Sequence, residues 1–81
     1  MATTFVTLAA GAGWQLASSA SDYLVQNLDS DSLLVTVQSS TPAAEAPYHE
    51  LRRGQAFAAV GSGGVYVRNP TAHEVRVAVT E

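Results

Sequence analysis

Cysteine and lysine are both missing from the 81-residue sequence, and charged residues make up only 14% of it. Without cysteine, the chain can form neither disulfide bonds nor thiolate metal sites. No apolar run is long enough to span a bilayer, so a membrane is not expected as a partner. The net charge is −3 and no basic cluster exceeds Arg52-Arg53, which argues against nucleic acid as a partner, because phosphates attract a basic face.

The short length predicts one domain, residues 1–81, with a small core. At this size the free energy gained by burying apolar area is nearly cancelled by the cost of ordering the chain. Since disulfides are excluded, we expect extra stability from oligomerisation or from docking on a larger assembly. A surface built mainly from Ser, Thr, Ala and Gly suits burial against protein neighbours, although a merely bland exterior explains the same composition.

The C-terminal residues 65–80 predict a β-hairpin. Valine occupies alternate positions on both sides of Asn69-Pro70, which is a turn signal, and alternate residues of a strand share a face. A single register of this hairpin places the valines opposite one another on one face and the polar residues opposite one another on the other face. It pairs Val65 with Val77, Val67 with Val75, Arg68 with Glu74, and Tyr66 with Arg76.

Alternating β-formers separated by turn residues predict further short strands before this hairpin. They cover residues 3–9, 14–17, 23–28, 33–39, 48–51 and 55–60. About eight strands at intervals of roughly ten residues predict an all-β fold, an antiparallel β-sandwich or jelly roll. Pro42 and Pro47 make residues 40–47 a loop or arm, and Gly54 is expected to take a positive φ in the tight turn from which residues 55–60 return.

No catalytic or metal-binding motif is present. His49-Glu50 and His73-Glu74 pair imidazole with carboxylate, but adjacent residues of a strand point to opposite faces and a structural zinc needs four ligands. The glycines at 11–13 and 61–64 lack the Lys-Ser/Thr of a phosphate-binding loop and are expected to form turns. No Gly-x-Ser-x-Gly elbow occurs either. We therefore expect no enzyme activity, no metal and no cofactor.

Aromatic residues allow two interpretations. Trp14, Tyr23, Tyr48 and Tyr66 could present rings on which sugars stack, which would make the chain a small carbohydrate-binding module. The simpler expectation is that Trp14 fills the core. Arg52-Arg53, at the tip of a turn, could hold an acidic neighbour or form part of a solvated loop.

Four segments resemble a pattern found in small proteins of tailed-phage genomes. They are Asp22-Tyr23-Leu24-Val25-Gln26-Asn27, Leu51-Arg52-Arg53-Gly54-Gln55, Val65-Tyr66-Val67-Arg68 and Val75-Arg76-Val77-Ala78-Val79-Thr80-Glu81, with Arg53 standing where the family pattern has proline. The resemblance implies a virion structural protein of the capsid decoration or cement type, commonly trimeric and docked on the major capsid protein or another virion protein. A tail or head-fibre component is the alternative. Such a protein is made in the cytoplasm of the bacterial host and is located in the virion.

Contact with such partners is expected at three places: the proline arm, the Arg52-Arg53 turn and the polar face of the predicted hairpin. The candidate contact residues are Pro42, Pro47, Arg52, Arg53, Tyr66, Arg68 and Arg76.

Overall fold

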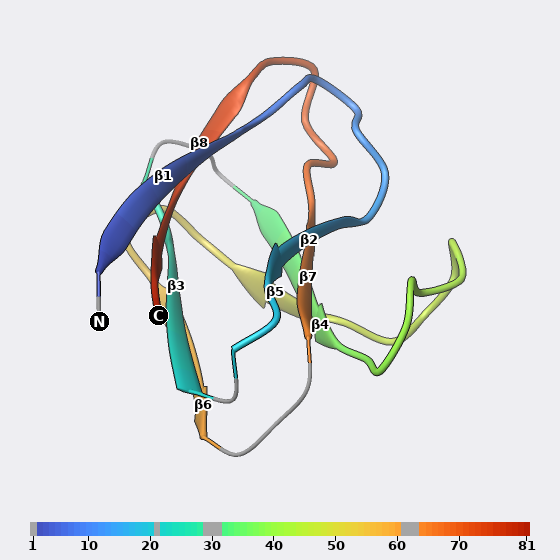
Figure 1. Cartoon of the computed structure of the whole chain (residues 1–81). Helices are drawn as coiled ribbons and strands as arrows, with labels where there is room; N and C mark the ends of the chain where they lie inside the picture. Colours follow the sequence, from blue (N-terminus) through green and yellow to red (C-terminus); the bar gives the residue numbers. More distant parts are fainter. Residues whose placement is uncertain (1, 21, 29–31, 61–63) are drawn as a thin grey trace.

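The computed structural model describes residues 2–20, 22–28, 32–60 and 64–81. Eight β-strands occupy most of this chain, and no helix occurs in it, so none is available to cross a membrane (Figure 1). The strands are β1 (Thr3–Leu8), β2 (Gln15–Ser18), β3 (Asp22–Asn27), β4 (Leu33–Val37), β5 (His49–Leu51), β6 (Ala56–Val60), β7 (Val65–Arg68) and β8 (Val75–Thr80).

The strands form two four-stranded antiparallel sheets. Sheet A has the order β1-β8-β3-β6 and sheet B the order β2-β7-β4-β5. The prediction of an all-β antiparallel sandwich of about eight strands is confirmed. Its pairs are nested, since β1 pairs with β8, β2 with β7, β3 with β6, and β4 with β5. The chain is therefore arranged like one long antiparallel ribbon that has been rolled into two layers.

The predicted C-terminal hairpin is wrong, because β7 belongs to sheet B and β8 to sheet A. The four predicted couples do not exist: Tyr66 lies opposite Leu16 and Thr36, Arg68 opposite Leu34, and Arg76 opposite Thr7. The valines are nevertheless buried as expected. They cover the inner faces of two different sheets, and alternation alone does not distinguish this arrangement from a hairpin.

The predicted return of residues 55–60 beside residues 48–51 is also a crossing between sheets, since β5 lies in sheet B and β6 in sheet A. The turn between them is as expected: Gly54 has a φ of +83°, and the Gln55 amide donates to the Arg52 carbonyl at 3.0 Å. A positive φ is accessible to glycine without steric cost.

The core lies between the two sheets. Aliphatic residues dominate it, and β1, β3, β4, β5, β7 and β8 each supply at least one buried member. The members are Leu8, Tyr23, Val25, Leu33, Val35, Leu51, Val65, Val67, Val75, Val77 and Val79, with Val6, Ala17 and Phe57 packed against them.

Candidate functional site

The proline-containing segment 38–48 covers part of the outer face of sheet B. Leu33 and Val35 of β4 point into the core, so Leu34 and Thr36 point outward, yet these two are only 9% and 4% exposed. The Arg68 Nη1 atom donates a hydrogen bond of 3.0 Å to the Ala44 carbonyl, which fastens the segment to β7. The expected arm therefore exists, and it lies against the sheet. We call this outer surface of sheet B and segment 38–48 the arm face.

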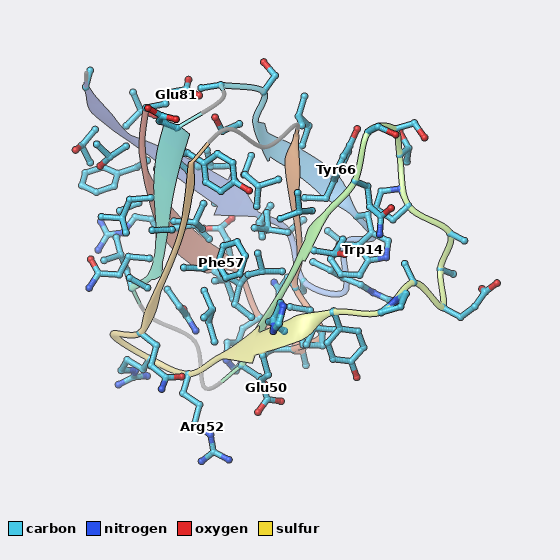
Figure 2. All side chains as sticks on the ribbon, turned by 90° about the horizontal axis from the view of Figure 1, so that it is seen from below. Trp14, Glu50, Arg52, Phe57, Tyr66 and Glu81 are labelled. Carbon is cyan, nitrogen blue, oxygen red and sulfur yellow. The ribbon has the colours of Figure 1, made fainter. Side chains whose placement is uncertain are left out.

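An aromatic pair lies on the arm face. Trp14 precedes the edge strand β2 and Tyr48 precedes the opposite edge strand β5, and their ring centroids are 6.5 Å apart at an interplanar angle of 50°. Figure 2 shows Trp14 within the curve of the arm. Trp14 is half-buried and lies outside the core, so the expectation that it fills the core is wrong. The physical reason is that Trp14 lies two residues before the outward-facing Leu16, and residues two apart in an extended chain point to the same face.

The polar edge of Trp14 has no partner in the described residues. Its Nε1 atom is enclosed and makes no hydrogen bond there. An enclosed N–H group without an acceptor costs free energy.

A groove of about 340 Å³ lies at the junction of the arm with β4 and β5, and Tyr48 of the pair lines it. Its walls contain an aromatic ring, hydroxyl and amide groups and one imidazole, with no carboxylate or guanidinium group. They are formed by Thr36, Val37, Gln38, Pro47, Tyr48 and His49. The Tyr48 side chain is 56% exposed, so its ring is accessible to a ligand. A groove with this lining suits an uncharged ligand that is apolar on one face and polar at its edges.

The structure brings four of the seven candidate contact residues to the arm face. Pro47 lines the groove, Pro42 is half-buried in the arm, and Tyr66 and Arg68 come from β7. These four residues therefore lie on one shared surface.

The other three candidates lie elsewhere. Arg52 and Arg53 are exposed in the turn before β6, and the Arg52 Nε atom is 3.8 Å from Glu50 Oε1, an exposed ion pair of small energetic weight. Arg76 lies on the outer face of sheet A, where its guanidinium is 5.3 Å from the centroid of the Phe5 ring. Arg68 and Arg76 are thus on opposite sides of the sandwich, and the single polar face predicted for them is wrong.

The described residues contain no group of three or more His, Cys, Asp or Glu side chains that could hold a metal ion. His49 packs its ring 5.5 Å from the Phe57 ring, and His73 lies in the connection between β7 and β8. Of the glycine clusters, Gly11 takes a φ of +66° in a turn, and residues 61–63 fall outside the described residues.

Sequence reasoning missed Phe5, which is 65% exposed on the outer face of sheet A. The sequence did contain evidence for this exposure. Val6 and Leu8 alternate with Thr7, so Phe5 shares the outward face with Thr7 and not the core face with Val6 and Leu8. Comparison with known proteins adds no assignment: no family model, curated protein or solved structure matches the chain.

Proposed function

We propose that the protein is a non-enzymatic structural component of a tailed-phage virion, of the type that decorates or cements the capsid. The observation that carries the proposal is the nested strand order, β1-β8-β3-β6 against β2-β7-β4-β5. We take this order as that of a jelly roll, a double-sheet architecture found in viral capsid domains as well as lectins. The resemblance of four segments to small phage proteins selects the viral option, so the argument rests on analogy of fold and sequence pattern.

The mode of action in this proposal is docking as an oligomer on a capsid or other virion protein. The arm face suits this role, because it presents an exposed aromatic ring and prolines held in place by the Arg68–Ala44 bond. A trimer is the number implied by the resemblance.

Electron microscopy of the particles whose genome encodes the chain tests the proposal. We expect density of a size suited to copies of this 8.4 kDa chain on the outside of the head. Density on the tail or on a head fibre would retain the virion role and reject decoration of the capsid. Particles that lack the protein altogether would reject both.

A second candidate function, binding of a neutral carbohydrate, is favoured by the groove and the Trp14–Tyr48 pair. Sugar rings stack their apolar faces on aromatic side chains, while hydroxyl groups bond to amide and hydroxyl groups such as those of Gln38 and Thr36.

Tyr48→Ala is expected to weaken binding of neutral oligosaccharides about tenfold or more, because it removes the exposed ring. Titration with a panel of neutral glycans, followed by the fluorescence of the single tryptophan, measures the affinity. Tyr23→Phe is the matched control, since Tyr23 lies in the core and away from the groove. If no glycan changes the fluorescence of the wild-type protein, the carbohydrate function is rejected.

A further inference from the structure

Strand β1 forms one border of sheet A and pairs only with β8 in the described part of the chain (Figure 1). It spans six residues, which makes it the longest of the four edge strands. The ladder between β1 and β8 is continuous from the pair Thr3–Thr80 to the pair Leu8–Val75, without a register shift. A long and regular edge is a template on which another strand can pair.

The hydrogen bonds at the end of this ladder show which backbone groups of β1 face outward. Ala2 and Glu81 exchange both of their backbone hydrogen bonds, at 2.8 and 3.0 Å. Bonded and non-bonded pairs alternate along an antiparallel ladder. The N–H and C=O groups of Thr3, Phe5 and Thr7 therefore point away from β8, toward the open edge.

The means by which proteins usually protect an edge are missing from β1. It contains no charged residue and no proline, and no bulge interrupts its pairing with β8. The other three edges differ. Strand β2 has a register shift between Leu16 and Ser18, and β5 is only three residues long. Strand β6 is one residue shorter than β1, and the described part of its outer face has only alanine side chains, which provide little contact area across a strand pair.

We propose that β1 pairs in antiparallel fashion with β1 of a second copy of this chain, so that two A sheets join into one continuous eight-stranded sheet. The two-fold axis passes between the two Phe5 residues. Only this register places all three outward-facing residues opposite one another: Thr3 faces Thr7 of the second copy, Phe5 faces Phe5, and Thr7 faces Thr3. The proposal rests on the oligomeric docking role given above, and it names a dimer in place of the trimer implied by the resemblance, because a two-fold contact closes at two copies.

The side chains of β1 favour β1 of a second copy of the chain as the strand that pairs with this edge. In a two-fold contact a strand pairs with a copy of itself, so a strand with charges of one sign would repel its partner, and β1 carries no charge. The register places two Phe5 rings on the outer face as a cross-strand aromatic pair, each with an Arg76 guanidinium 5.3 Å away within its own chain. It also pairs threonines, whose hydroxyl groups can bond across strands.

The contact is small. Pairing of three outward-facing residues forms about six backbone hydrogen bonds, and an edge of this length covers less than the roughly 800 Å² per partner of a standard interface. We therefore expect a dimer that dissociates on dilution in solution and that becomes persistent where copies are held close together on a larger assembly.

Phe5→Lys tests the edge contact. It replaces an exposed ring and sets two positive charges against each other at the axis, so the dissociation constant of the dimer is expected to rise about tenfold or more. Leu24→Lys is the matched control, because Leu24 is 41% exposed on the same face but lies in the interior strand β3. Sedimentation velocity over a wide concentration range measures both. The proposal is overturned by a strict monomer, by a trimer unaffected by Phe5→Lys, or by equal effects of the two variants.

A mixture of two single-cysteine proteins tests the register. Thr3→Cys and Thr7→Cys are expected to form a disulfide with each other, since directly opposed residues have Cα atoms about 5.5 Å apart. In a dimer formed by one variant alone, the two cysteines are offset by four residues along the strands. At roughly 3.3 Å per residue they lie about 13 Å apart, which is beyond the reach of a disulfide. The chain has no other cysteine to interfere. Equal bridging in the mixture and in either variant alone contradicts the register.

These outcomes separate the edge contact from the virion role. Density on the particle together with a monomer that shows no β1 cross-link rejects the edge contact alone. A β1 dimer without density on any particle rejects the virion role alone.

Discussion

Replacing Thr3 and Thr80 by cysteine and oxidising the pair is expected to raise the free energy of unfolding by about 4 kcal/mol, because the bridge closes nearly the whole chain into a loop. The two residues are directly opposed in the β1–β8 ladder, and their hydroxyl oxygens are 2.7 Å apart. They form a non-hydrogen-bonded pair, whose Cα atoms lie about 4.5 Å apart, within the range of a disulfide. Urea unfolding of the oxidised and reduced forms gives the difference.

The matched control is the double variant Tyr66→Cys/Arg76→Cys. The two residues were opposed in the predicted hairpin, but they lie on the outer faces of different sheets, which pack about 10 Å apart. We expect no bridge within one chain and no gain in stability. A disulfide between these positions, or none between positions 3 and 80, would contradict the observed topology.

Alternation in the sequence predicted the strands and the direction of their side chains well. Val65, Val67, Val75 and Val77 are buried, and the bounds of β7 and β8 agree with the alternating runs. These features depend on the period of two residues within a single strand, which is local information. All eight expected strands are present for the same reason.

The membership of strands in sheets could not be predicted in this way. A valine-rich strand shows the same alternation whether its partner follows at once or lies 69 residues away, as Thr7 does from its partner Arg76. Asn69-Pro70 was a correct turn signal, but a turn can lead into the same sheet or into the opposite one. The two polar couples inferred from the hairpin register, Arg68 with Glu74 and Tyr66 with Arg76, were lost with it.

The candidate site was predicted in part. The prolines identified the arm, and Tyr66 and Arg68 were placed on an outward-facing strand surface, where they lie near it. The unbroken apolar run Leu33-Leu34-Val35 is typical of a strand covered on both faces, so it weakly indicated that Leu34 is buried on the outer side of β4. The pairing of Trp14 with Tyr48 depends on the path of the arm, for which the sequence has no local rule.

Asn69 is the residue that fixes the crossing from β7 to β8. It is fully buried, and its Nδ2 atom donates to the carbonyls of Leu8, Ala9 and His73, at 3.4, 3.0 and 2.8 Å. Its Oδ1 atom accepts from the backbone amide and the hydroxyl of Thr71, at 2.9 and 2.6 Å. One side chain thus joins the end of β1 to both ends of the connection between the sheets.

Asn69→Ala is expected to lower the free energy of unfolding by roughly 3 kcal/mol, because it leaves several backbone groups at a buried position without partners. For a domain whose total stability is on the order of 5 kcal/mol, such a loss produces a large unfolded fraction. Gln26→Ala is the control: its Nε2 atom also donates to a backbone carbonyl, that of Gly54 at 3.0 Å, but in an exposed position, so the loss should stay below about 1 kcal/mol. Urea titration followed by circular dichroism measures both, and equal losses would show that the crossing does not depend on Asn69.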